Sequence, residues 1–124
     1  KHAFLTVSIY RQLTGLVRFD RLLREYFEDK LQLTLGLPTV QYCADKLCMS
    51  PNYFGDVIKK TTGDTASGHI RQFVIQLAKN GLAAGETVSQ VSDRLGFEYP
   101  QHFSRMFKKQ EGVTPSEYVG KMRL

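Results

Sequence analysis

The amino-acid sequence predicts an all-α fold of about seven helices in which one structural unit occurs twice. Apolar residues recur at three- and four-residue steps, and capping and stop residues divide the chain into helical lengths. No segment shows the alternation of a convincing strand. The third observation is an internal repeat: Thr39-Val40-x4-Asp45-x-Leu47 returns as Thr87-Val88-x4-Asp93-x-Leu95, and Phe54-x4-Lys59-Lys60-x2-Gly63-x-Thr65-x-Ser67 returns as Phe103-x4-Lys108-Lys109-x2-Gly112-x-Thr114-x-Ser116.

The two copies are offset by 48 positions in their first half and by 49 in their second. One residue has therefore been inserted near Tyr99-Pro100. Each copy predicts a helix, a tight turn and a second helix. The expected architecture is homeodomain-like and duplicated, with helix-turn-helix subdomains at about 39–63 and 87–112 and a linker helix at about 65–81.

The first residues have no clear period, and a short strand and the tail of a preceding helix both remain open. We treat residues 1–15 as a linker or the remnant of an upstream domain, followed by the domain at 16–124. From Leu16 to Phe27 an apolar stripe predicts a helix that ends near Lys30. Gly36 and Pro38 then break the chain.

In the first copy, Thr39 is the expected N-cap of a short helix over 40–47. Cys48 occupies the turn position where the second copy has Gly96, so it would be strained if that turn needs a positive φ. Ser50-Pro51 predicts the start of the second helix, and Gly63 predicts its end.

In the remainder of the chain, Thr65 opens the linker helix, which we expect to end around Asn80-Gly81. Thr87-x-x-Gln90 is a capping-box pattern, and Pro100 and Gly112 bound the next helix. Thr114-Pro115-Ser116-Glu117 predicts a last helix whose apolar residues return to the core, namely Tyr118, Val119 and Met122.

Length, net charge and apolar content limit the class of protein to which the chain can belong. The 124 residues suffice for one domain, and a net charge of +5 permits an anionic partner without demanding one. No run of about 18 apolar residues and no signal-peptide pattern occurs, so we expect no membrane association and a cytoplasmic location. The chain begins at Lys1 without an initiator Met, so we expect it to be a fragment of a longer protein.

The residue types do not favour catalysis. Cys43 and Cys48 have no second Cys/His pair at zinc spacing, and Cys43 aligns with the core position Val91, so we expect neither metal nor cofactor. No nucleophile triad, paired carboxylate site or phosphate loop is evident. Asp45 and Asp93 are more simply surface or capping groups. We therefore predict no enzyme activity and no catalytic residue.

A helix-turn-helix reads DNA because its first helix braces the second, whose outward side chains reach base edges in the major groove. Two units in one chain can occupy successive major-groove segments if their centres lie about 34 Å apart. In the second unit the outward base-contact candidates are Gln101, His102, Ser104 and Arg105. Gln pairs with adenine and Arg with guanine. An ordinary solvated face remains the alternative, and for His102 exposure without a DNA role is an equal alternative.

The first unit offers different chemistry at the aligned positions. Asn52 and Tyr53 are its base-contact candidates, whereas Gly55 replaces Ser104 and Asp56 replaces Arg105. Asp56 would repel phosphates, although a carboxylate can accept a hydrogen bond from cytosine. We expect the second unit to contribute most of the base reading.

Phosphate-contact candidates lie at helix ends, where each also has a structural explanation. Lysines near helix C-termini complement the helix dipole, and threonines at N-termini act as caps while their helices present N–H groups to phosphate. These candidates are Thr39, Lys59, Lys60, Thr87, Lys108 and Lys109.

Together these motifs resemble the DNA-binding domain of the AraC/XylS family of bacterial transcription regulators. The second unit carries Gly96-Phe97-x5-Phe103-Ser104-Arg105-x-Phe107-Lys108-Lys109-x2-Gly112-x-Thr114-Pro115-x-Glu117-Tyr118. The first carries Ala44-x2-Leu47-x2-Ser50-Pro51-x-Tyr53-Phe54-x3-Ile58-Lys59-Lys60-x2-Gly63. The resemblance covers roughly residues 17–120.

The resemblance implies a seven-helix domain that binds an asymmetric double-stranded DNA site and activates or represses transcription. It implies base or nearby backbone contacts at Asn52, Tyr53, Gln101, His102 and Arg105, and Gly55 and Asp56 depart from the residues usual there. It also implies RNA polymerase as a partner and an effector-sensing or dimerisation domain upstream. The alternative function is a helical protein-interaction module with weak or lost DNA binding, for which Asp56 is the motivating residue.

Overall fold

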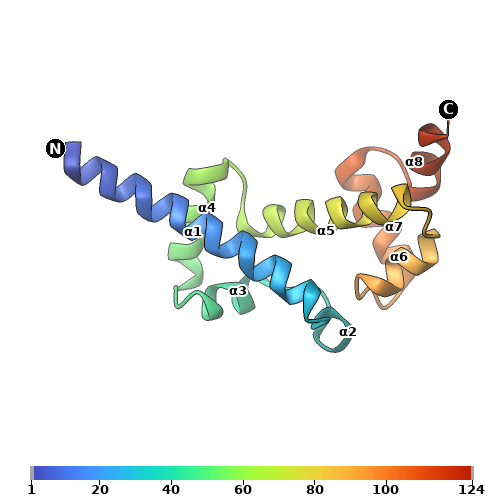
Figure 1. Ribbon diagram of the computed structural model, residues 1–124, viewed down its shortest axis with the longest axis horizontal. Coiled ribbons are helices and arrows are strands. Elements are labelled where there is room, and N and C mark those ends of the chain that lie inside the picture. Colours follow the sequence, from blue (N-terminus) through green and yellow to red (C-terminus); the bar gives the residue numbers. More distant parts are fainter. Residues whose placement is uncertain (1, 124) are drawn as a thin grey trace. The chain divides into compact units, whose positions relative to one another are not determined.

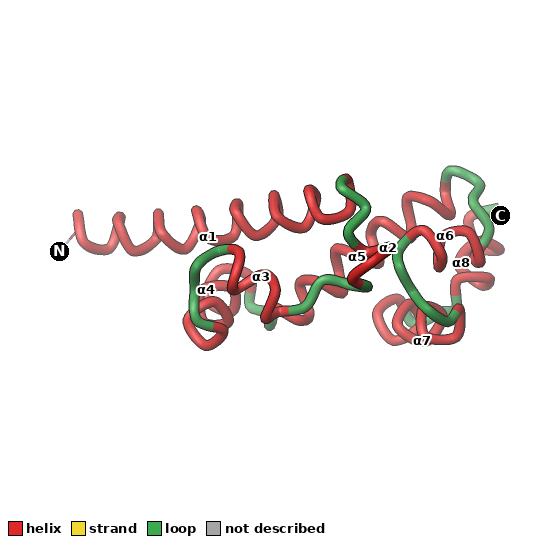
Figure 2. Tube along the Cα trace, turned by 90° about the horizontal axis from the view of Figure 1, so that it is seen from below, coloured by secondary structure: helices red, strands yellow, loops and turns green. Residues whose placement is uncertain are grey.

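The computed structural model describes the backbone of residues 2–123 and the side chains of residues 9–123. Within this part of the chain every regular element is a helix and no strand occurs (Figure 2). The eight helices are α1 (His2–Glu28), α2 (Gln32–Leu35), α3 (Val40–Lys46), α4 (Pro51–Thr62), α5 (Ala66–Ala83), α6 (Val88–Arg94), α7 (Pro100–Glu111) and α8 (Pro115–Met122). None of them is long and apolar enough to span a membrane.

The chain divides into two compact units. One contains residues 1–29 and 38–70, and the other contains residues 30–37 and 71–124. The all-α prediction is confirmed, as are two helix-turn-helix pairs, α3–α4 and α6–α7, with the linker helix α5 between them in sequence.

In the first unit α1 crosses and packs on α4 (Figure 1). Phe19, Leu23, Phe54 and Ile58 are completely buried, and the Phe19 and Phe54 rings meet edge to face with centroids 4.8 Å apart. Gly15 permits this approach, because a Cβ there would lie 3.0 Å from Cγ1 of Val57. The glycine inside α1 is thus a packing residue and does not end the helix.

Residues 2–15 are helical, so the expected linker is the beginning of α1. The predicted helix from Leu16 to near Lys30 is only the second part of this element. The exposed side chains Ile9, Tyr10 and Leu13 explain why the stripe begins late: no buried face is paired with them among the described residues. Lys1 lies outside the described residues.

In the second unit aromatic side chains form the core between α6, α7 and α8. Phe103 and Phe107 are completely buried, and their rings contact Phe97 and Tyr118 respectively. Tyr118 and Val119 are half-buried, as expected of core-facing residues at the edge, but Met122 is exposed, so its predicted return to the core is wrong. α8 ends at Met122 and leaves that side chain in solvent.

The predicted caps are confirmed. Thr65 Oγ1 accepts from the backbone N–H of Gly68 at 2.9 Å, and capping boxes form at Thr87–Gln90 and Thr114–Glu117. The linker helix extends three residues beyond Asn80, to Ala83, and Gly81 is buried within it. Packing of Leu82, which is 4% exposed, accounts for this extra turn.

The single-turn helix α2 was not predicted because four residues are too few to show a period. Its Gln32 is buried, and the side-chain amide donates to the carbonyl of Arg94 at 2.9 Å. The backbone carbonyl of Gln32 faces Gly96, where an added Cβ would lie only 2.6 Å away. Gln32 therefore contacts both the end of α6 and the turn that leads into α7, and it constrains their positions.

The turns of the two helix-turn-helix pairs have the same hydrogen bonds. Cys48 N and Met49 N donate to the carbonyls of Asp45 and Ala44, as Gly96 N and Phe97 N donate to those of Asp93 and Ser92. The shared turn requires a positive φ, which is 58° at Cys48 and 89° at Gly96. The expected strain at Cys48 is thus present, because L-residues other than Gly rarely adopt this conformation.

We predict that Gly96→Ala destabilises the domain more than Gly112→Ala does. Both glycines have a positive φ, so each substitution costs about 1 to 2 kcal/mol of backbone strain. Only at Gly96 does the new methyl group meet backbone, whereas nothing lies within 4 Å at Gly112. Urea unfolding of both variants measures the difference, expected at a further 1 to 3 kcal/mol or so. Equal losses would show that Gln32 does not constrain this turn.

Candidate functional site

Helix α4 is held so that one side is buried and the other faces solvent. Ser50 Oγ accepts from the backbone N–H of Tyr53 at 3.2 Å, and Pro51 begins the helix as expected. The buried side consists of Phe54, Val57 and Ile58. The exposed side carries the sequence-predicted residues Asn52, Tyr53, Lys59 and Lys60, together with Asp56.

Helix α7 is oriented by the corresponding positions. Phe103 and Phe107 occupy the aligned positions of Phe54 and Ile58, and all four side chains are completely buried. The exposed side of α7 carries Gln101, His102, Arg105, Lys108 and Lys109, whereas Ser104 is half-buried. The structure thus places all the outward candidates of each unit on one helix, except that Ser104 is less accessible than its neighbours.

An exposed tyrosine ring lies at the start of each of these helices. Tyr53 is 52% exposed and Tyr99 is 50% exposed. The Tyr99 ring meets the His102 ring at a centroid distance of 5.4 Å in a T-shaped arrangement. His102 is therefore partly positioned by its neighbour. Sequence reasoning missed Tyr99, although an aromatic residue directly before a helix-starting Pro was a usable signal.

The two threonine candidates are N-caps. Thr39 Oγ1 accepts from Tyr42 N at 3.0 Å, and Thr87 Oγ1 accepts from Gln90 N at 3.1 Å. Gln90 Oε1 in turn accepts from Thr87 N at 2.9 Å. Both hydroxyl groups are thus engaged in holding the first turns of α3 and α6. The capping explanation accounts fully for these contacts.

The four lysine candidates lie in the last turns of α4 and α7, where they complement the negative end of the helix dipole. Lys108 and Lys109 differ in their surroundings. Hydrogen bonds from Thr114 lower the pKa of Glu117, and Lys108 and Lys121 lower it further by their charge. Lys108 therefore has a carboxylate neighbour on α8, whereas Lys109 lines a hollow together with Arg71 and Arg105. Arg71, on α5, was not a sequence candidate.

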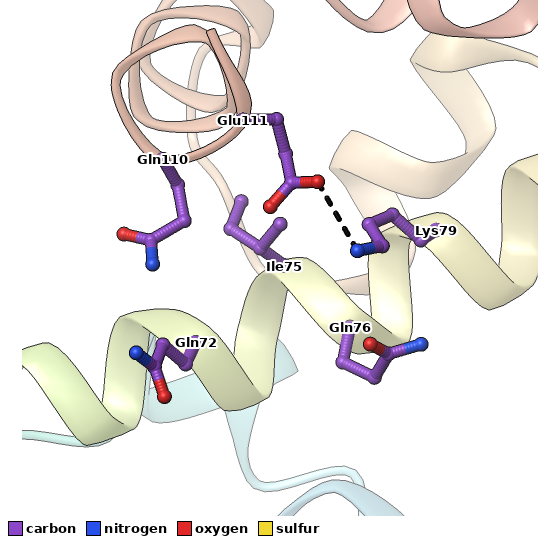
Figure 3. A pocket seen from close by; sticks show the side chains of 6 residues that line it. All are labelled: Gln72, Ile75, Gln76, Lys79, Gln110 and Glu111. Carbon is purple, nitrogen blue, oxygen red and sulfur yellow. Dashed lines mark hydrogen bonds and ion pairs between the residues drawn. The ribbon is translucent and has the colours of Figure 1, made fainter.

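A polar hollow of about 250 Å³ lies between α5 and the C-terminal end of α7 (Figure 3). The half-buried Lys79 Nζ and Glu111 Oε1 form an ion pair across it at 3.1 Å. The glutamines Gln72, Gln76 and Gln110 and the apolar Ile75 complete its lining. The ion pair joins the end of α7 to α5, so it helps to set the position of α7 in this unit.

The two cysteines have different environments. Cys43 is completely buried, and burial raises the pKa of its thiol to about 12. It is thus a neutral core residue, as its alignment with the buried Val91 indicated. Cys48 is exposed and unpaired. Within the described residues no group of three or more His, Cys, Asp or Glu side chains is placed to hold a metal ion.

Comparison with known proteins identifies one matching family and three similar transcription regulators. A family described as a helix-turn-helix domain matches residues 43–121. The transcriptional regulators YtdP and YesN of Bacillus subtilis are 33% identical over 81 residues and 34% identical over 77 residues, which cover 64% and 60% of this chain. NimR of Escherichia coli is 34% identical over 74 residues, or 60% of this chain. The matched regions are only 10%, 21% and 27% of these three regulators.

Solved structures share the fold. The C-terminal domain of the response regulator YesN from Fusobacterium nucleatum has a TM-score of 0.65 at 24% identity, covering 81% of this chain and 96% of that one. The DNA-binding domain of AdpA, crystallised with a target DNA, has a TM-score of 0.68 at 21% identity, covering 85% and 92%. At these identities the likeness concerns the fold alone.

The family match extends over more than half of the chain and covers both helix-turn-helix pairs except the first three residues of α3. The matching relatives are transcriptional regulators rather than members of an enzyme class. The chain therefore belongs to the AraC-type helix-turn-helix family of transcription regulators.

Proposed function

We propose that this chain is the sequence-specific DNA-binding domain of a transcription regulator and that α4 and α7 read two successive major-groove segments. The observation that carries the proposal is the face of α7 that bears Gln101, Arg105 and Lys108 in solvent while Phe103 and Phe107 are completely buried behind it. A helix braced in this way can enter the major groove without losing its core contacts. The AdpA domain, which shares the fold, is crystallised in complex with a target DNA, and this supports DNA binding by the present chain.

In the second unit Gln101 and Arg105 are the principal base readers. They are one helical turn apart near the start of α7, so both can reach base edges together. Gln101 suits adenine and Arg105 suits guanine, since each side chain forms two hydrogen bonds in those pairings. His102, held against Tyr99, contacts a base or the adjacent backbone. Ser104 is a weaker candidate because it is half-buried.

In the first unit Asn52 and Tyr53 are the base-contact residues. Both are exposed in the first turn of α4. Gly55 supplies no side chain, and Asp56 places a negative charge where α7 has Arg105. The first helix therefore contributes less to affinity than the second.

Phosphate contacts come from the helix ends that flank each groove. Lys59 and Lys60 serve the first unit, and Lys108 and Lys109 serve the second. The first turns of α3 and α6, capped by Thr39 and Thr87, present backbone N–H groups to phosphate. In the whole protein, RNA polymerase and an effector-sensing or dimerisation domain are the further partners that we propose, with the cytoplasm as the site of action.

The deciding experiment measures duplex affinity against salt. Selection from random duplexes first identifies a preferred site, and titrations of that site and a scrambled site follow at several KCl concentrations. We expect tighter binding to the selected site and a steep fall in affinity as salt rises, because phosphate contacts release counterions. A chain with no appreciable affinity for any duplex would instead be a helical protein-interaction module.

We predict that Arg105→Ala weakens binding to the preferred site by about 1 to 3 kcal/mol and removes the preference at one base pair. Arg105→Lys is the matched control. It keeps the charge but loses the bidentate geometry, so it should retain non-specific affinity while losing the same base preference. Equal losses on preferred and scrambled duplexes in Arg105→Ala would assign this side chain to phosphate.

We predict that Asp56→Arg strengthens binding to all duplexes by about 1 to 2 kcal/mol and lowers the ratio between preferred and scrambled sites. Glu28→Arg changes the net charge equally at an exposed position on α1, and we expect a smaller effect from it. Fluorescence anisotropy titrations compare the three proteins. A loss of affinity in Asp56→Arg would show that the carboxylate accepts a hydrogen bond from a base.

A further inference from the structure

Tyr99 is a large, mainly apolar side chain that lies in solvent at the start of α7. Its exposed fraction is 50%, and its ring meets the ring of His102 in a T-shaped arrangement with centroids 5.4 Å apart. Gln101 and His102 are both exposed in the first turn of the helix. An exposed aromatic pair therefore accompanies the first residue that we propose to read a base.

The backbone fixes the position of Tyr99. Phe97, two residues earlier, is buried, and its ring packs against that of Phe103 with centroids 5.3 Å apart. Pro100 follows, and a residue before proline is restricted to extended conformations, which agrees with φ −128° and ψ 133° at Tyr99. The carbonyl of Tyr99 also accepts a hydrogen bond from His102 N at 3.1 Å. A side chain on so constrained a backbone loses less freedom on binding, and this favours affinity.

Helix stability does not explain a tyrosine at this position. The other helices from α3 to α8 begin with a Ser or Thr whose hydroxyl oxygen accepts a backbone N–H, namely Thr39, Ser50, Thr65, Thr87 and Thr114. Tyr99 aligns with Ser50 of the first copy, but its side chain makes no capping hydrogen bond. The second copy thus has an exposed ring where the first has a stabilising cap.

The major groove offers one apolar group that such a ring can contact. The C5-methyl group of thymine projects into this groove, whereas the other groups that distinguish the bases there donate or accept hydrogen bonds. Gln101 suits adenine, whose partner in the duplex is thymine. Residues at the N-terminal end of a reading helix are those that contact base edges. Tyr99 lies at that end, so a thymine methyl group is the base feature that its ring fits best.

We propose that Tyr99 is a specificity-determining residue whose ring packs on a thymine methyl group at, or next to, the base pair read by Gln101. The inference rests on the proposed function and extends it to a residue that precedes the reading helix. His102 supports the ring from one side through the edge-to-face contact. The contact is apolar, so it selects thymine without releasing counterions from the duplex.

The first arm of the test compares DNA binding by wild type, Tyr99→Ser, Tyr99→Phe and Tyr10→Ser. Tyr10 is 70% exposed on α1, so its variant controls for the loss of a surface tyrosine. We expect Tyr99→Ser to bind the preferred duplex about fivefold to tenfold more weakly, with little change on scrambled duplexes. Its log-log salt slope should stay the same because no charge is removed. Tyr99→Phe, which keeps the ring, and Tyr10→Ser should bind as wild type does.

Thermal unfolding separates weaker binding from loss of the fold. A serine at this position can cap α7 as Ser50 caps α4, so we expect Tyr99→Ser to melt about 2 to 6 °C above wild type. Weaker DNA binding by a more stable protein cannot be attributed to unfolding. Tyr99→Ala, which leaves α7 without a side-chain cap as in wild type, replaces the serine variant in both arms if that variant does not fold.

The second arm locates the methyl group. Deoxyuridine replaces each thymidine of the preferred duplex in turn, which removes only the C5-methyl group. We expect one replacement to weaken binding by wild type and Tyr99→Phe about fourfold, the effect of exposing one buried methyl group. The same replacement should have no further effect on Tyr99→Ser, because the contact is already lost.

The outcomes are distinct. No duplex binding by wild type overturns the proposed function and this inference together. Tight binding by wild type with an equal affinity in Tyr99→Ser, or with no thymine position coupled to Tyr99, overturns only the inference. Equal losses in Tyr99→Phe and Tyr99→Ser would assign the contact to the phenol hydroxyl group and would also overturn the methyl contact.

Discussion

Each unit depends on two buried side chains that lie one turn apart on its second helix. Phe54 and Ile58 in α4, like Phe103 and Phe107 in α7, are completely buried. Only one rotation of a helix about its axis buries both members of such a pair, so the residues left in solvent are determined at the same time. Burial of each side chain contributes about 1.5 to 3 kcal/mol, more than the roughly 0 to 1 kcal/mol of a typical exposed ion pair. The surface that we propose to face DNA is thus determined by the packing of the core.

The duplication extends beyond the helix-turn-helix pairs. The start of α5 aligns with α8: Thr65 caps the N–H of Gly68 as Thr114 caps that of Glu117. The first unit accordingly ends with the first turns of α5, at Ile70. The linker helix is therefore the first unit's third helix, extended by further turns that belong to the second unit. This dual membership explains why α5 contributes buried residues to both units, Ala66 and Ile70 to the first and Val74 and Ala78 to the second.

Local signals made most of the fold predictable, and tertiary contacts made the rest unpredictable. Caps such as Ser50 and Thr87 depend on neighbours within three residues, so they can be read from the sequence. The Gln32 side chain donates a hydrogen bond to the carbonyl of Arg94, 62 positions away, and no local sequence pattern predicts that contact. The outward residues of α4 and α7 follow from helical periodicity, and their exposure agrees with it except at Ser104. The ion pair between Lys79 and Glu111 joins residues 32 positions apart, and no repeat signal in α5 predicts it.

The two copies bury the same aligned positions but differ in charge at an exposed one. Cys43 and Val91, which align, are both completely buried, as are Phe54 and Phe103. By contrast, the exposed Asp56 aligns with the exposed Arg105, so the charge at one outward position is reversed. A carboxylate and a guanidinium favour different bases, since one accepts and the other donates hydrogen bonds. Under the proposed function, two helices with the same support but opposite donor patterns would prefer different half-sites, so the proposal entails an asymmetric binding site.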